Sequence, residues 1–225
     1  MSKLLITSGP TRQYLDPVRY LTNASSGRTG AAIAQAALNH GYEVIVVSGP
    51  VEIDYPSDAV VVPVVSTEDM LEACMKYLPE TEGVIGVAAP CDYRPVTVFK
   101  TKMSKKDFTQ KDGSGGELEL RMIETPDIMA SLGKIKEKYP VPDQPDRKRW
   151  MVCFALETND RRVHALQKLQ RKCCDLVVLN DSSALHQMTT SVEIIAPDGE
   201  LVASFQGNKL DVAEEIMSTI VYRFY

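Results

Sequence analysis

The N-terminal part of the sequence places a helical pattern between two apolar runs, and this order constrains the fold more than any other feature. Residues 3–7 are mostly apolar and stop at a Ser-Gly-Pro turn, which is typical of a buried strand. The Ala-rich segment 31–38 has apolar residues at helical spacing, and Gly41 follows it where a helix C-cap belongs. Residues 43–48 form a second, β-branched run. Such a strand-helix-strand unit builds a parallel sheet.

The same alternation continues along the rest of the chain. Further elements are predicted from apolar periodicity, namely strands at 59–65, 83–89, 150–156 and 175–179, and helices at 68–78 and around 164–169. Two runs on either side of a Pro-Asp-Gly-Glu turn, 191–196 and 201–205, predict a hairpin. The last helix carries a stripe that we expect to face the core, made of Leu210, Ala213, Met217, Ile220 and Phe224.

The loop at 139–149 is rich in Pro, Asp and Lys and could be mistaken for a linker between domains. A buried strand pattern resumes directly after it, so the alternation is not interrupted. We therefore predict a single domain over residues 1–225. Its fold class is α/β, with a Rossmann-like, mostly parallel sheet flanked by helices and a C-terminal antiparallel hairpin plus helix.

Composition limits the classes of protein to which this chain can belong. Its 225 residues are 44% hydrophobic, which is enough to fill a substantial core. A net charge of −5 argues against a nucleic-acid partner, and no apolar stretch approaches the roughly 20 residues that cross a bilayer. The five cysteines form no C-x-x-C pair, and the N-terminus has no signal-peptide pattern. We expect a cytoplasmic protein with free thiols and no membrane contact.

Polar residues concentrate between the first strand and the first helix, where segment 7–30 reads TSGPTRQYLDPVRYLTNASSGRTG. The small residues Gly27 and Gly30 would let an anion approach the free N–H groups at the start of the helix, where the helix dipole favours phosphate. The alternative is that Ser25, Ser26 and Gly27 only cap the helix. Neither G-x-G-x-x-G nor G-x-x-x-x-G-K-[ST] occurs in the chain, so ordinary NAD or P-loop chemistry loses support.

Polar groups also follow the later strands. Asp92 lies just beyond the strand at 83–89, and Asn180 and Asp181 follow the strand at 175–179. Ligands of open parallel sheets bind beyond the carboxyl ends of the strands, so these residues are site candidates, although Asp92 alone is also typical of a turn. Lys168 and Lys172 lie four residues apart on one helical face. They are either solvated or directed toward phosphate groups.

A lysine-rich segment interrupts the alternation between residues 97 and 122. Its five lysines stand at positions 100, 102, 105, 106 and 111. They would either close over a polyphosphate or form a solvated face. Residues 118–123 alternate as a half-exposed strand does, which predicts a basic hairpin arm packed beside the main sheet. Thr125 is expected to cap the next helix, with Pro126 in its first turn.

Several of these motifs occur in a fixed order, namely SGPTRQYLDPVRYLTNASSGRTG, SGPV at 48–51, AAPCDYRP, the lysine-rich arm, TPDI, FALET and KLQRKCCDLVVLND. In this order they resemble the phosphopantothenate-cysteine ligase family. The resemblance spans residues 4–181 and is more specific than any single glycine loop. In bacteria this unit often follows a flavin-dependent decarboxylase domain. That domain is absent from the sequence, so we expect a standalone ligase.

The resemblance implies that the protein joins L-cysteine to 4'-phosphopantothenate in coenzyme A biosynthesis. Most bacterial members use CTP and eukaryotic ones use ATP; we expect CTP, together with Mg²⁺. The substrate carboxylate would attack the α-phosphate, pyrophosphate would leave, and the cysteine amine would capture the acyl-nucleotidylate. The family is dimeric, so a homodimer is expected, and a separate phosphopantothenoylcysteine decarboxylase is a candidate partner.

The resemblance also assigns roles to residues. Asn23 and Lys102 are expected to be catalytic, Asn23 by contacting the acyl intermediate and Lys102 by binding the triphosphate. Asp16 and Arg19 are expected near the substrate and the dimer contact. The nucleotide is expected to contact Gly9, Ser25, Ser26, Gly27, Asp92, Phe154, Lys168, Lys172, Asn180 and Asp181. The sequence assigns no metal ligands.

Three positions depart from the family pattern. The arm has Lys102-Met-Ser-Lys-Lys where Lys-Ile-Lys-Lys is usual, Thr125 replaces an asparagine, and Cys91 stands where alanine is common.

Two other functions also fit the alternation of strands and helices. One is a Rossmann-type NAD(P)-dependent reductase, which shares the alternating strands and helices. The other is a non-catalytic nucleotide-binding module.

Overall fold

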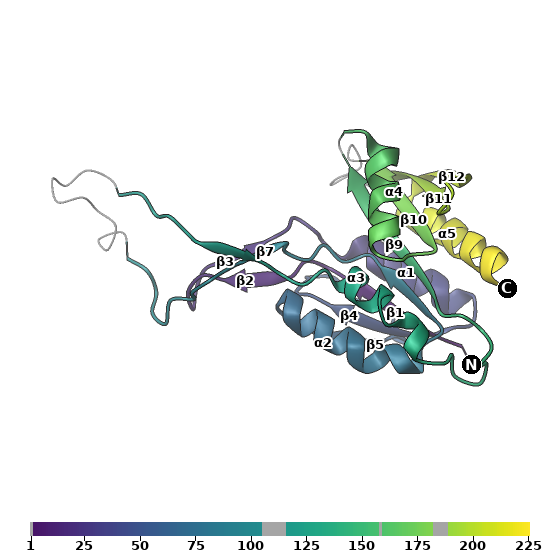
Figure 1. The fold of residues 1–225 in the computed structure, drawn as a ribbon, viewed down its shortest axis with the longest axis horizontal. Helices are drawn as coiled ribbons and strands as arrows, with labels where there is room; N and C mark the ends of the chain where they lie inside the picture. The colour runs from purple at the N-terminus through teal and green to yellow at the C-terminus, as the bar shows by residue number, and fades with distance from the viewer. Residues whose placement is uncertain (1, 105–115, 158, 182–188) are drawn as a thin grey trace.

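An eight-stranded sheet forms the centre of the computed structural model, which describes residues 2–104, 116–157, 159–181 and 189–225 (Figure 1). The strand order in space is β12-β11-β10-β9-β6-β1-β4-β5. The parallel strands are β1 (Lys3–Ser8), β4 (Glu43–Ser48), β5 (Val60–Pro63), β6 (Gly83–Gly86), β9 (Trp150–Glu157) and β10 (Leu176–Asp181). The antiparallel strands at one edge are β11 (Thr189–Ile195) and β12 (Leu201–Asn208). The predicted fold class is confirmed.

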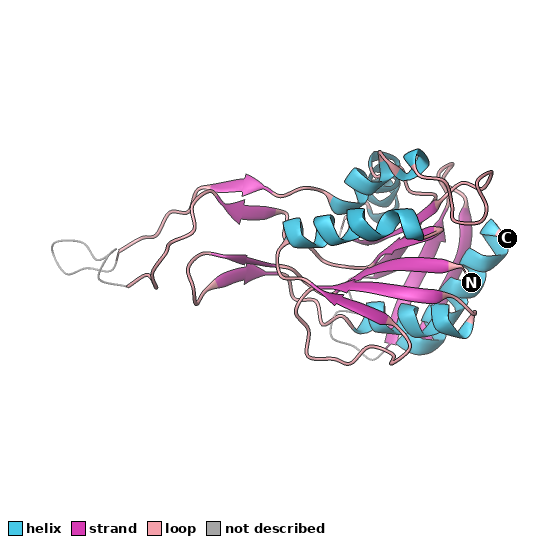
Figure 2. Ribbon diagram, turned by 90° about the horizontal axis from the view of Figure 1, so that it is seen from below, coloured by secondary structure: helices cyan, strands magenta, loops and turns pink. Residues whose placement is uncertain are grey.

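Helices cover both faces of the sheet (Figures 1 and 2). Helices α1 (Arg28–Asn39) and α5 (Lys209–Phe224) share one core with Ile6. The other core contains Leu5 and is covered by α2 (Thr67–Tyr77), α3 (Ile128–Gly133) and α4 (Arg161–Arg171). Successive strand residues point to opposite faces, so a strand covered on both sides is apolar throughout. None of the helices within the described ranges is long and apolar enough to cross a membrane.

Two details of the helices differ from the sequence-based expectation. The buried stripe of α5 is made of Val212, Ala213, Ile216, Met217 and Ile220. Leu210 lies before this stripe begins and is 64% exposed. The N-cap of α3 is Asp127 and not Thr125, because the Asp127 carboxylate accepts from the Ala130 N–H at 3.0 Å. Thr125 stands two residues too early, and its hydroxyl donates to the Cys91 carbonyl instead.

The loop between α3 and β9, which includes the short 3-10 helix η3 (Lys136–Lys138), is fastened by a buried arginine. The guanidinium of Arg149 is 3% exposed and donates to the carbonyl oxygens of Thr81 at 2.7 Å, Lys136 at 2.9 Å and Tyr139 at 2.9 Å. Buried donors require acceptors, and here they come from the loop and from the turn after the other short 3-10 helix, η1 (Leu78–Glu80). The loop therefore packs on the domain, as expected for a segment that is not a linker.

Two small two-stranded sheets project from the carboxyl ends of β1 and β6 (Figures 1 and 2). One pairs β2 (Arg12–Tyr14) with β3 (Tyr20–Thr22), and the other pairs β7 (Tyr93–Pro95) with β8 (Met122–Glu124). The strand expected at 118–123 thus lies at 122–124, and the arm extends away from the main sheet because its partner is β7. Lys105, Lys106 and Lys111 lie outside the described residues.

Candidate functional site

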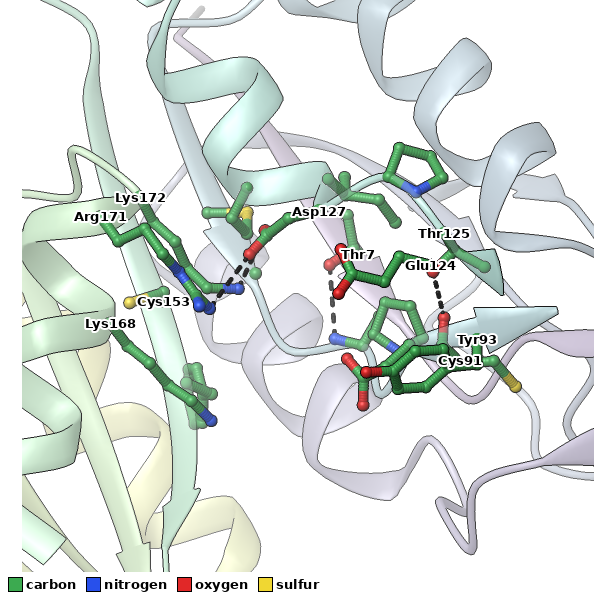
Figure 3. Close-up of a pocket in the computed structure, with 18 residues that line it drawn as sticks. Thr7, Cys91, Tyr93, Glu124, Thr125, Asp127, Cys153, Lys168, Arg171 and Lys172 are labelled. Atoms are coloured by element: carbon green, nitrogen blue, oxygen red, sulfur yellow. Dashed lines mark hydrogen bonds and ion pairs between the residues drawn. The ribbon is translucent and has the colours of Figure 1, made fainter. Parts of the chain in front are cut away.

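A pocket of about 470 Å³ lies at the carboxyl ends of β6 and β9 (Figure 3). Its walls come from the loop after β6, the segment before α3, the end of β9 and the C-terminal half of α4. The residues that line it are Thr7, Gly86, Ala88, Pro90, Cys91, Asp92, Tyr93, Glu124, Thr125, Pro126, Asp127, Ile128, Met129, Cys153, Phe154, Lys168, Arg171 and Lys172. This volume lies in the range of small-molecule sites.

Four predicted nucleotide residues line this pocket together, namely Asp92, Phe154, Lys168 and Lys172. Phe154 also borders a small cleft on the α1 and α5 side, which contains Asn180. The backbone of Asp181 pairs with Glu157 at the end of β10, and its side chain lies outside the described part of the structure. The pocket is therefore lined by Asp92, Phe154 and both lysines, with the Phe154 side chain also packed against the α1 and α5 core, whereas Asn180 lies in the neighbouring cleft.

The basic face of α4 forms one wall of the pocket (Figure 3). Lys168, Arg171 and Lys172 stand three and four residues apart, which is the spacing of neighbours on one helix face. The Lys172 ammonium lies 3.0 Å from the Asp127 carboxylate, and Arg171 lies 3.4 Å from the same carboxylate. Lys168 is 2.7 Å from Glu157. An anionic ligand would have to exchange partners with these carboxylates.

Asp127 links the pocket to the start of α3. Burial alone would raise the pKa of its carboxyl, but the hydrogen bond from Ala130 N–H and the charge of Lys172 lower that pKa below its usual value. The carboxylate therefore stays ionised as a partner for the basic wall. Sequence reasoning missed Asp127 as a site residue, since the T-P-D motif was interpreted only as a helix start. It also missed Arg171, whose position three residues after Lys168 was the available signal.

Cys153 is a further lining residue that the sequence did not single out. It lies on β9 directly before Phe154 and interacts with the thiol of Cys174, which itself donates to the Lys172 carbonyl oxygen at 3.8 Å. The interaction between the two thiols lowers the pKa of Cys153 and raises the pKa of Cys174, with Lys172 and Lys168 adding to the lowering at Cys153. The alternation of β9 explains its place, because Cys153 faces the α4 side of the sheet.

Two glycine turns lie at the carboxyl end of β1 and at the start of α1. Gly9 has φ 72° and Gly27 has φ 77°, a backbone region that favours glycine. A Cβ at either position would lie 2.8 Å from Cγ1 of Val51. Gly27 is the N-cap of α1, and no side chain of the described residues caps this helix. Ser25 and Ser26 therefore do not act as caps, and the first N–H groups of α1 stay available.

Gly30 has a packing role that the sequence did not indicate, and its expected role in anion approach stays a prediction. A Cβ at Gly30 would lie 2.0 Å from the Ser8 hydroxyl oxygen and 2.5 Å from the Ser8 Cβ. Real Cβ atoms do not approach other atoms so closely, so glycine is required for α1 to lie against β1. This contact sets how closely the N-terminus of α1 packs against the carboxyl end of β1.

Asn23 joins the loop before α1 to the pocket wall. Its side-chain amide nitrogen donates to the carbonyl oxygens of Ala89 at 3.1 Å and Pro90 at 2.8 Å, and Pro90 lines the pocket. Lys102 lies at the base of the arm and is exposed, outside the lining of the pocket. Asp16 is fully buried and ion-paired with Arg19 at 2.7 Å.

The carboxylates of the site do not form a metal-binding cluster. Across the described ranges no group of three or more His, Cys, Asp or Glu side chains is placed to hold a metal ion. The residues present therefore do not fit a resident metal site, since Mg²⁺ takes several oxygen ligands in octahedral geometry.

Comparison with known proteins places this chain in a family. The profile of the DNA/pantothenate metabolism flavoprotein C-terminal domain matches residues 1–223. The Coenzyme A biosynthesis bifunctional protein CoaBC of Bacillus subtilis (strain 168) is 38% identical over 222 residues, which cover 96% of this chain and 50% of that protein. The CoaBC protein of Escherichia coli (strain K12) is 36% identical over 225 residues, covering 98% and 52%. The chain spans about half the length of these relatives.

A solved structure supports the same assignment. The crystal structure of the C-terminal domain of Coenzyme A biosynthesis bifunctional protein CoaBC superimposes with a TM-score of 0.75 at 34% sequence identity, covering 97% of this chain and 93% of that one. Sequence and fold therefore agree over nearly the whole chain. The chain belongs to the DNA/pantothenate metabolism flavoprotein C-terminal domain family.

Proposed function

We propose that this protein is a phosphopantothenate-cysteine ligase, which joins L-cysteine to 4'-phosphopantothenate in coenzyme A biosynthesis. The observation that carries the proposal is the pocket that brings Asp92, Phe154, Lys168 and Lys172 to one place at the strand ends. These residues come from three separate parts of the chain and match the nucleotide residues that the family resemblance implies. Similarity to the CoaBC proteins, whose name refers to coenzyme A biosynthesis, supports the same pathway.

In this proposal the nucleotide lies across the pocket with its base at Asp92 and its phosphates at α4. A carboxylate accepts hydrogen bonds from the exocyclic amine of cytosine, and Phe154 offers a face for stacking. Lys168, Arg171 and Lys172 supply cationic donors for phosphate oxygens. CTP is the proposed donor, on the resemblance of Asp92 to the family aspartate that reads cytosine.

The proposed chemistry has two steps, and both develop negative charge on oxygen. The phosphopantothenate carboxylate attacks the α-phosphate of CTP, which forms acyl-CMP and releases pyrophosphate. The cysteine amine then attacks the acyl carbon, which forms the amide and releases CMP and a proton. Donors fixed in advance stabilise such charges best. The first N–H groups of α1, which no side chain of the described residues caps, are donors of this kind. The Asn23 amide would contribute by exchanging the Ala89 and Pro90 carbonyl oxygens for the developing oxyanion. Magnesium would enter the pocket bound to the phosphates of the nucleotide.

Pyrophosphate release tests the reaction directly. Purified protein is incubated with 4'-phosphopantothenate, Mg²⁺ and either CTP or ATP, with and without cysteine. We expect CTP to give about one equivalent of pyrophosphate without cysteine and multiple turnovers with it, because the acyl-nucleotidylate waits for the amine. Pyrophosphate release with ATP and not with CTP would show that ATP is the nucleotide donor. No pyrophosphate release with either nucleotide would contradict the ligase assignment. In that case, protection of the protein against heat unfolding by CTP would favour a nucleotide-binding module. NADPH that stays bound to the protein through gel filtration would favour a reductase.

Asn23→Asp is predicted to separate the two steps. Aspartate removes the donors that now face the Ala89 and Pro90 carbonyl oxygens and places a carboxylate against them. The pyrophosphate burst should remain, whereas amide formation should fall by about 10²- to 10³-fold, as for the loss of a transition-state donor. Quench-flow analysis would detect accumulated acyl-CMP. Asn39→Asp, at the far end of α1, is the matched control and should turn over normally; normal turnover by Asn23→Asp would refute the role.

Lys172→Gln is predicted to weaken nucleotide use without unfolding the pocket. Asp127 keeps Arg171 as a partner in this variant, so the fold should be retained. The loss of one charge-assisted hydrogen bond to phosphate, of about 1.5–3 kcal/mol, should lower kcat/KM for CTP by about 10- to 100-fold. The KM for cysteine should not change. Lys76→Gln on exposed α2 is the control, and equal effects of both substitutions would argue against phosphate binding by α4.

We further propose that the arm forms the contact of a homodimer. The two small sheets and the segments next to them expose ten large apolar side chains, namely Tyr14, Val18, Tyr20, Leu21, Tyr93, Val96, Val98, Phe99, Leu118 and Ile123. Exposed apolar side chains that form a patch mark interaction sites. The family resemblance, which implies that one subunit helps to build the site of the other, supports a second copy of this chain as the partner that covers this surface.

A separate phosphopantothenoylcysteine decarboxylase is a second proposed partner. Gel filtration of a mixture of the two proteins would test whether they bind each other.

Sedimentation velocity at micromolar concentration tests the dimer. We expect a dimer for the parent protein and a shift toward monomer for Leu21→Asp, since a charge buried in the contact is costly. Leu210→Asp is the control because this leucine is exposed on α5, away from the arm. A monomeric parent protein would overturn the assignment.

A further inference from the structure

A buried carboxylate holds the base of the arm. Asp16 lies in the turn between β2 and β3 and has an exposed fraction of 0%. One of its oxygens accepts from the backbone N–H groups of Val18 at 2.8 Å and Arg19 at 2.7 Å. The other accepts from the Arg19 guanidinium at 2.7 Å and from the backbone N–H of Met103 at 3.0 Å. Four donors thus converge on one side chain, and one of them belongs to the arm.

The arm is fixed to this turn by two other hydrogen bonds and by the burial of one arm side chain. The Arg19 guanidinium also donates to the Met103 carbonyl at 3.0 Å, so both polar backbone groups of Met103 are bound. The Met103 side chain is 6% exposed, although Lys102 and Ser104 on either side are exposed. Further back, the Phe99 N–H donates to the Leu15 carbonyl at 2.9 Å. We call the contacts among Asp16, Arg19 and Met103 the arm clamp.

The arm clamp depends on the charge of Asp16. Burial alone would raise the pKa of this carboxyl, but the N–H groups of Val18, Met103 and Arg19 and the Arg19 charge lower it to about 2. The group is therefore ionised at every physiological pH. Asparagine has the same shape but only one acceptor oxygen. Its amide nitrogen would face either the Arg19 and Met103 donors or the two turn N–H groups, leaving donors unpaired.

We propose that Asp16 is a positioning residue that sets the register of Lys102 by binding the next residue, Met103. The proposal rests on the proposed function, in which Lys102 binds the nucleotide triphosphate. It replaces the expectation that Asp16 contacts the substrate, because all of its surface is covered. Arg19 differs, since its side chain is 43% exposed and retains donors for an external partner. A clamp next to Lys102 is effective because a lysine side chain alone has many rotamers, and fixing its backbone reduces the misplacement that lowers rates.

A double-mutant cycle on the rate of pyrophosphate release tests whether Asp16 acts through Lys102. Asp16→Asn and Lys102→Gln are each expected to lower this rate by about 10- to 100-fold, and the double variant should be no slower than Lys102→Gln alone. The KM for cysteine should not change. Met103→Ala is a milder second variant that keeps the Asp16 carboxylate, and its smaller effect should also vanish in the Lys102→Gln background. Asp69→Asn, which removes the capping box of α2, is the control that changes only stability.

Amide hydrogen exchange over residues 99–104 provides a readout that is independent of activity. Asp16→Asn should speed exchange in this segment, because the clamp loses its negative charge and one of its two acceptor oxygens, so that the turn and Met103 are no longer both bound. Unchanged exchange would overturn the arm clamp. Faster exchange would still overturn the positioning role of Asp16 in either of two cases. In the first, the rate losses of Asp16→Asn and Lys102→Gln multiply in the double variant. In the second, Lys102→Gln alone does not lower the rate of pyrophosphate release. Failure of the proposed function is distinct, since the parent protein itself would then release no pyrophosphate.

Discussion

The parallel pairing of β6 between β1 and β9 decides where every other part of the site lies. Parallel strands bring their carboxyl ends to one edge, so the loops after these three strands meet there. Close packing on β6 requires glycine at both of its ends. A Cβ at Gly83 would lie 2.2 Å from the Trp150 ring, and one at Gly86 would lie 2.5 Å from the Met129 sulfur. The space left by Gly86 is filled by the Met129 side chain of α3, and the position of α3 brings Asp127 to the pocket wall.

The pocket that results is balanced in charge before any ligand binds. The lysines of α4 are paired with Asp127 and Glu157, which keeps the basic wall ordered. Partly exposed ion pairs of this kind contribute little to stability. A triphosphate, which carries several charges on one molecule, can therefore replace these carboxylates at modest cost. This arrangement suits a site that must bind a polyanion and release its products.

The sequence predicted the sheet and the helices well because apolar periodicity reports directly on burial. The rule for parallel sheets, which needs only the order of elements, singled out Asp92, whereas Phe154 was named from the family resemblance alone and Lys168 and Lys172 from their spacing on a helix together with that resemblance; all four line the pocket. Sequence reasoning missed Asp127 and the arm clamp, because these depend on contacts between distant residues. The Asp16 and Met103 pair is separated by 87 positions, and no periodicity marks such a contact. The packing of Gly30 on Ser8 was missed for the same reason, as Ser8 belongs to another element.

Asp16 and Asp127 show how one kind of side chain can serve two opposite purposes in this molecule. Both have a lowered pKa, so both are ionised near neutrality. Asp16 is fully covered and bound mostly by backbone N–H groups, which no ligand can displace without unfolding the turn. Asp127 holds one backbone N–H and two side-chain cations that face an open pocket. Asp16 is thus suited to fixing the arm. Asp127 is suited to releasing Arg171 and Lys172 when a phosphate group binds them.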